Sequence, residues 1–208
     1  MTARNKQSGQ RRSRSPRKAT PEYLRRAALY HLERYASSSA SLRRVLLRRV
    51  ARSAEAHGTD RDEGADEVEK LLARLQEQGL LDDAAYAHSR ARSLRRRGAS
   101  ARAVRARLAA KGIGRQLAEQ ALADLAEEQG GDPELAAAAA FARRRRLGPW
   151  RLPEARAERR LRDLAALGRQ GFSVSLARKV IDAEDIEAVE ALLDDAAQSE
   201  SEGGGFSP

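Results

Sequence analysis

A run of basic side chains without a single acid occupies the middle of the chain, from Ala84 to Arg115. Guanidinium and ammonium groups bind anionic oxygens through charge-assisted hydrogen bonds. Exposed helix faces normally mix both signs of charge, because side chains then pair at i,i+4 spacing. A face of one sign repels itself, so we interpret this run as a surface for an anionic partner. The alternative is a solvated surface that binds nothing.

The first predicted helix of this run places several basic side chains on one face. They fall at positions i, i+4, i+7 and i+8: His88, Arg92, Arg95 and Arg96. We predict that this face is exposed, opposite the side that carries Ala87, Ala91 and Leu94. Later helices extend the predicted binding set with Arg102, Arg105, Lys111, Arg143, Arg144, Arg145 and Arg146. DNA phosphates, single- or double-stranded, are the expected anions.

Residue patterns for catalysis are missing from the sequence. His31, His57 and His88 stand apart and have no metal-ligand spacing, and the chain has no cysteine to act as nucleophile or thiolate ligand. No glycine-rich phosphate loop ends in Lys-Ser or Lys-Thr. We therefore expect no enzyme activity, no cofactor and no metal.

Composition predicts the fold class. Of the 208 residues, 34% are charged and only 4% are aromatic, and Ala, Leu, Arg and Glu, all good helix formers, dominate. We predict an all-α protein. No apolar run reaches the roughly 18 residues of a membrane span, and the absence of cysteine is compatible with the cytoplasm, where we expect the protein. The formal net charge of +10 again favours an anionic partner.

Breaks rich in Gly, Ser, Asp and Pro divide the chain. We predict a disordered basic arm at 1–20, three tandem three-helix units at 21–83, 84–131 and 132–183, and an acidic flexible tail at 184–208. Units of about 50 residues bury little surface alone, so we expect neighbouring units to pack end to end into an elongated, curved body.

Two matches in spacing support the repeat. Ser38 precedes Leu42 and Leu46 at the offsets at which Ser100 precedes Val104 and Leu108. The glycines of Lys111-Gly112-Ile113 and Gln170-Gly171-Phe172 are followed by apolar residues at identical offsets. The two matches relate different pairs of units, which indicates a repeated architecture.

A predicted joint links the first two units. It comprises Gly79, Leu80, Leu81, Asp82 and Asp83, followed by Tyr86. Glycine ends a helix because it adopts the left-handed conformation freely, and an aspartate can cap the amides that open the next helix. We expect both leucines to fold back onto the last turn.

Two other segments carry expectations. The Gly- and Asp-rich stretch 55–65 is predicted to be a loop. Trp150 lies in a proline-flanked insertion and is expected to fill a seam between helices, with stacking on a nucleic-acid base as the alternative.

Together, the joint, the two helix endings and the three tandem units resemble the RecX family of bacterial RecA regulators. The resemblance covers about residues 22–183. It implies that the RecA recombinase filament is the partner. It also implies that the protein lies along the groove of the RecA–DNA filament and limits RecA activity in DNA repair and recombination.

A different class of function stays open at this point. A helix-turn-helix in residues 84–131 could bind duplex DNA directly. Base readout requires Asn, Gln or Ser among the arginines, and the helix that starts at Ser100 offers mainly arginine and alanine. We therefore favour the filament regulator and expect a monomer.

Overall fold

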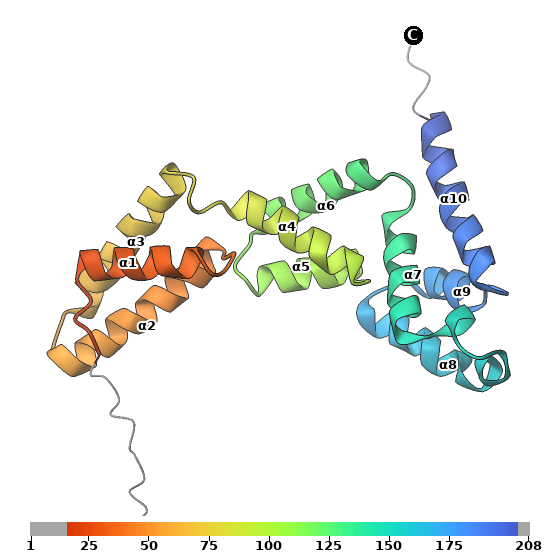
Figure 1. Ribbon diagram of the computed structural model, residues 1–208, viewed down its shortest axis with the longest axis horizontal. Coiled ribbons are helices and arrows are strands. Elements are labelled where there is room, and N and C mark those ends of the chain that lie inside the picture. Colours follow the sequence, from red (N-terminus) through yellow and green to blue (C-terminus); the bar gives the residue numbers. More distant parts are fainter. Residues whose placement is uncertain (1–15, 204–208) are drawn as a thin grey trace, which may run out of the picture. The chain divides into compact units, whose positions relative to one another are not determined.

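The computed structural model describes residues 16–203, with side chains up to Ser199. Over these residues it contains ten α-helices and one short 3₁₀ helix, with no strand (Figure 1). The all-α prediction is confirmed. Most of the predicted basic arm, residues 1–15, lies outside the described residues. Two compact units form: the first contains residues up to Tyr35 and Leu42–Leu80, and the second contains Ala36–Ser41 and everything from Leu81.

Three helices build the first unit: α1 (Pro21–Leu32), α2 (Ser39–His57, of which the unit contains all but the first turn) and α3 (Arg61–Glu77). Apolar side chains at helical spacing form its core, because burial of one face stabilises each helix. The largest fully buried side chains of this unit are Leu24, Leu42, Leu46, Val68 and Leu75.

The prediction of a loop at 55–65 is wrong for most of that segment. Helix α2 continues to His57 and α3 begins at Arg61. The Asp60 side chain accepts hydrogen bonds from the amides of Asp62 and Glu63. Acidic residues that looked like a loop signal are therefore a helix cap and a first turn, where carboxylates favour the helix dipole.

The predicted joint coincides with the end of one helix and the start of the next. Gly79 has φ +68°, and the Leu80 amide donates to the Leu75 carbonyl, which closes α3. Asp82 accepts hydrogen bonds from two amides at the start of α4. Leu81 is buried, but Leu80 is exposed, so the expectation that both leucines pack inward is wrong for Leu80.

Helices α4 (Asp83–Arg96), α5 (Ala101–Ala109) and α6 (Arg115–Gln129) form the first part of the second unit. Small side chains fill much of their common core, which includes Ala87, Ala91, Val104, Leu108 and Leu125. Because many of these side chains are small, little apolar area per residue is available to hold the helices together.

The second part contains α7 (Pro133–Arg145), the 3₁₀ helix η1 (Gly148–Trp150), α8 (Pro153–Gln170), α9 (Val174–Ile181) and α10 (Ile186–Gly203). Its core is larger and includes Phe141, Leu167, Phe172, Val180 and Ile181. Trp150 packs against this core, as predicted for a residue that fills a seam.

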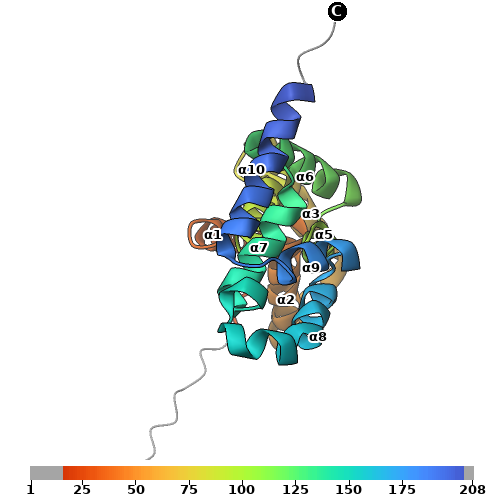
Figure 2. The same cartoon turned by 90° about the vertical axis from the view of Figure 1, so that its right-hand side faces the viewer.

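Helix α10 replaces most of the flexible tail predicted at 184–208. It lies beside α7 (Figures 1 and 2), with Val189 fully buried. Leu192 and Leu193 pack against the same core. The many acids of this segment concealed an apolar stripe at i, i+3 and i+4 spacing, which is sufficient to dock a helix. Residues 204–208 lie outside the described residues.

The turn after α4 approaches α7 too closely for a side chain. Gly98 has φ +77°, and a Cβ there would lie 2.4 Å from the Phe141 backbone nitrogen. We expect Gly98→Ala to lower the free energy of unfolding by about 3 kcal/mol, since left-handed strain adds to overpacking. Gly79→Ala, where φ is similar but the space is open, is the control and should cost about 1 kcal/mol. Urea unfolding measures both, and equal losses would contradict the close approach.

Docking of α10 can be tested in the same way. We expect Val189→Asp to lower the free energy of unfolding by about 3 kcal/mol, because it buries an unpaired carboxylate. Ala191→Asp adds the same charge at an exposed site of the same helix and should cost about 0.5 kcal/mol or less. Thermal unfolding followed by circular dichroism compares the two. A flexible tail would tolerate both changes equally.

Candidate nucleic-acid interface

Helix α6 supplies an acid to the basic face of α4. The Glu128 carboxylate lies 3.2 Å from the His88 Nε2 atom and also accepts a hydrogen bond from Arg92. The charge of Arg92 is therefore neutralised in part within the chain, and His88 lies beside the same carboxylate. The interpretation of α4 as a face of one sign needs this correction, because the pairing acid comes from beyond the acid-free run.

Arg95 is not part of the exposed face. Its side chain is only 7% exposed, and it donates hydrogen bonds to the Ala99 carbonyl at 3.1 Å and to the Glu134 carboxylate at 2.5 Å. The prediction of an exposed Arg95 is wrong because it follows Ala87 by eight residues, and so lies on the buried side of α4. Burial and two strong acceptors make it a structural residue.

Arg105 is bound by Glu119 on α6 in a two-pronged arrangement, with N–O distances of 2.9 and 2.8 Å. These hydrogen bonds lower the pKa of Glu119, against a smaller opposing effect of burial. A lowered pKa means that the pair stabilises the fold above the pKa of the unfolded glutamate. That contribution is lost as the pH falls through the folded pKa. Because the pair is exposed, we expect it to contribute little.

The remaining residues of the predicted binding set are exposed, and among the described residues they have no acidic partner. They are Arg96, Arg102, Lys111, Arg143, Arg144, Arg145 and Arg146. Arg145 lies 6.0 Å from the centre of the Phe141 ring, and Arg146 ends α7 in the left-handed conformation, with φ 54°. The prediction of binding residues also omitted other exposed arginines of the second unit, among them Arg97, Arg107, Arg162 and Arg169. Their charge was visible in the sequence, but their exposure was not.

The structure therefore separates the predicted set into two groups. His88, Arg92, Arg95 and Arg105 are held by acids of the chain itself, whereas the exposed group remains able to bind phosphate or carboxylate oxygens. Among the described residues, no cluster of three or more His, Cys, Asp or Glu side chains could hold a metal ion. None of the described helices combines the length and apolar character needed to span a bilayer.

Comparison with known proteins gives the family. A regulatory protein RecX of Myxococcus xanthus strain DK1622 is 48% identical over 168 residues, which cover 80% of this chain and 88% of the relative. The chain belongs to the RecX family. A second regulatory protein RecX, from Agrobacterium fabrum strain C58, is 32% identical over 84% of this chain and 89% of its own length.

A match to a family model over part of the chain, and a solved structure with a similar fold, agree with this family. Residues 82–122 match the model for the RecX second three-helix domain, and they contain α4, α5 and half of α6. A crystal structure of regulatory protein RecX superposes with a TM-score of 0.53 at 24% identity, over 78% of this chain and 71% of that one. The fold is therefore shared, and the relatives' names support a regulatory role.

Neighbouring arginines of α4 provide a test of the two groups. We expect Arg95→Met to lower the free energy of unfolding by about 2–4 kcal/mol, since it leaves Glu134 without its buried partner. Arg96→Met, the control one residue further along the chain, should change it by about 0.5 kcal/mol or less. Chemical denaturation measures both. If the two variants were equally stable, Arg95 would not be a structural residue.

Proposed function

We propose that this chain regulates the RecA recombinase by binding the RecA–DNA filament along its groove and inhibiting its ATPase and recombination activity. Membership of the RecX family is the observation that carries this proposal. The predicted division into three three-helix units is part of it, since repeated units suit a partner that repeats along an axis. The chain would act as a monomer and without catalysis of its own.

Exposed arginines of the second unit are the proposed contacts. Arg96 near the end of α4 and Arg102 at the start of α5 have no acidic partner among the described residues, unlike Arg92 and Arg105. Cations without internal partners can neutralise DNA phosphates, or acids of the filament, without breaking an existing pair. This difference gives the proposal a specific pair of residues to change.

The rate of ATP hydrolysis by RecA on single-stranded DNA tests the proposal. The parent chain should lower this rate. We expect the double variant Arg96→Glu/Arg102→Glu to need roughly tenfold more protein for the same inhibition, because it replaces attraction by like-charge repulsion at the interface.

The variant Arg96→Lys/Arg102→Lys keeps both charges and is the matched control, which should inhibit nearly as the parent does. Circular dichroism confirms that all variants fold. A parent chain that leaves RecA hydrolysis unchanged would overturn the proposed function. If the folded double Glu variant inhibited as fully as the parent, the contact surface would instead lie elsewhere on the chain.

A further inference from the structure

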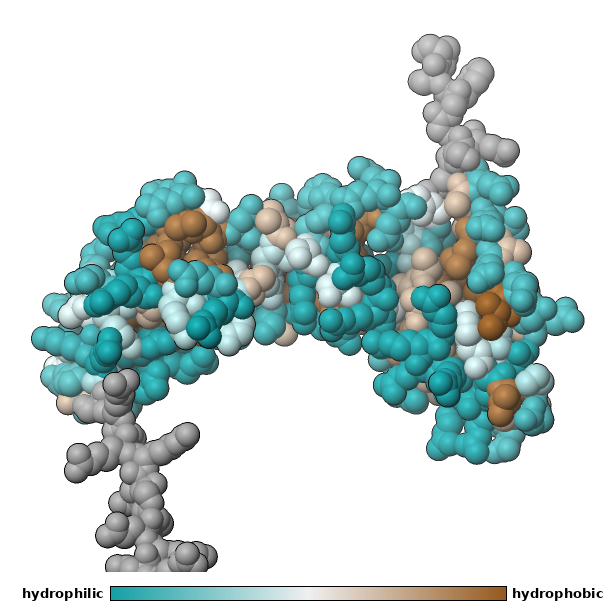
Figure 3. Space-filling view, in the orientation of Figure 1, coloured by the Kyte–Doolittle hydropathy of each residue, from teal (hydrophilic) through white to brown (hydrophobic). Residues whose placement is uncertain are grey.

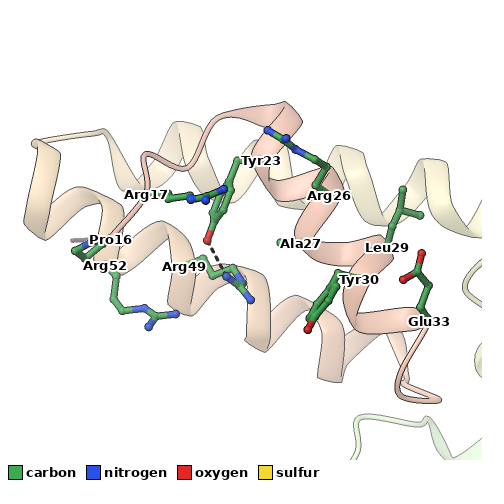
Figure 4. A pocket seen from close by; sticks show the side chains of 10 residues that line it. All are labelled: Pro16, Arg17, Tyr23, Arg26, Ala27, Leu29, Tyr30, Glu33, Arg49 and Arg52. Atoms are coloured by element: carbon green, nitrogen blue, oxygen red, sulfur yellow. Dashed lines mark hydrogen bonds between the residues drawn. The ribbon is translucent and has the colours of Figure 1, made fainter. Parts of the chain in front are cut away.

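A groove of about 710 Å³ lies in the first unit between α1, α2 and the segment that leads into α1 (Figure 4). Its size falls within the roughly 300–1,000 Å³ of ordinary ligand sites. Arg17, Tyr23, Tyr30, Arg49 and Arg52 are among its lining residues. Hydrophilic side chains cover most of the surface visible over α2 in Figure 3. The groove therefore combines aromatic rings with arginines.

Positive charge in this groove exceeds what its acids neutralise. Arg49 donates a 2.7 Å hydrogen bond to the Tyr23 hydroxyl, a neutral acceptor, and its Nε atom is buried without a partner in the described part of the chain. Arg17 and Arg52 have no acidic partner among the described residues, and Glu33 is the single acid of the lining. The pKa of His31 is lowered, first by burial and then by the charge of Arg49. A net positive groove attracts an anion.

The aromatic side chains add a second kind of contact. Tyr30 is 55% exposed, which is unusual for a ring of this size beside a core. The Arg34 guanidinium lies 4.5 Å from the centre of this ring. Exposed rings interleaved with arginines are typical of proteins that bind single-stranded nucleic acid, because bases stack on the rings while the cations follow the backbone.

We propose that this groove binds single-stranded nucleic acid, with a base stacked on Tyr30 and backbone phosphates at Arg17 and Arg52. A duplex could not stack a base on Tyr30, since its bases are already stacked and paired. The chain before Pro16 carries Arg4, Lys6, Arg11, Arg12 and Arg14 and no acid, so it has the wrong charge to occupy the groove itself. The site requires no recombinase, and it therefore goes beyond the proposed function and can fail independently of it.

Fluorescence anisotropy of a short dye-labelled oligothymidylate, titrated with the full chain at low salt and without RecA, tests the site. We expect Tyr30→Ala to weaken binding about tenfold, the scale of one lost base stack. Tyr30→Phe keeps the ring and should bind like the parent. On an oligonucleotide of the same length without bases, parent and Tyr30→Ala should bind equally weakly.

Charge at the groove is tested with a matched pair. Arg52→Glu should weaken binding about tenfold and make the dependence of affinity on salt less steep, because roughly one phosphate contact is lost. Arg25→Glu changes the net charge identically at an exposed residue of α1 that does not line the groove, and it should have a much smaller effect.

Four results would overturn the proposal, given variants with the helical signal of the parent. The first is equal binding by Tyr30→Ala and Tyr30→Phe. The second is equal loss for Arg52→Glu and Arg25→Glu, which would mean attraction by net charge alone. The third is displacement of the oligonucleotide by polyglutamate as effectively as by unlabelled oligothymidylate, which would assign the groove to an acidic protein. Displacement by ATP at oligonucleotide-like concentrations would limit the ligand to a single nucleotide and would also contradict the backbone contacts.

Discussion

The Glu134 carboxylate joins three helices of the second unit. From α7 it accepts hydrogen bonds from the buried Arg95 side chain of α4 and from the Ala101 amide that opens α5. A buried guanidinium is costly without a partner, and the amides at a helix start need acceptors, so one carboxylate meets both requirements. The close approach of Gly98 to Phe141 depends on the same packing of α4 against α7. Few large side chains are available here, which makes these polar contacts more important.

Another polar contact, between a buried serine hydroxyl and a backbone carbonyl, occurs at two places in the second unit. The buried Ser100 hydroxyl donates to the Gln170 carbonyl at 2.5 Å, just before a left-handed glycine, and the buried Ser38 hydroxyl donates to the Lys111 carbonyl at the same distance. An acid caps the next amide in both places, Glu134 in the first and Asp83 in the second. Serine, glycine and acid therefore form one repeated docking arrangement, which explains why these residues recur at matching positions.

Arginine has several roles in this chain, and its environment determines which one. Arg95 is enclosed and bound on two sides, whereas Arg96, its neighbour in sequence, is exposed and has no acidic partner among the described residues. Arg49 contacts the ring and hydroxyl of Tyr23 and leaves its charge unneutralised. An enclosed arginine such as Arg95 stabilises the fold, whereas Arg96 and Arg49 make surfaces that favour anions. The high net charge thus arises from side chains with different functions.

The sequence alone determined the helical class, the helix ends at Gly79 and Gly112, and the resemblance to the RecX family, because composition, glycine conformation and apolar spacing act locally. The sequence did not determine which charged side chains are buried, paired or exposed. Pairing of Arg92 with Glu128 joins residues distant in sequence, and burial of Arg95 requires the presence of α7. Helix α10 likewise exists because Val189 meets a core built by other helices. Burial and ion pairing are properties of packed helices, so only the tertiary structure decided which charges are free.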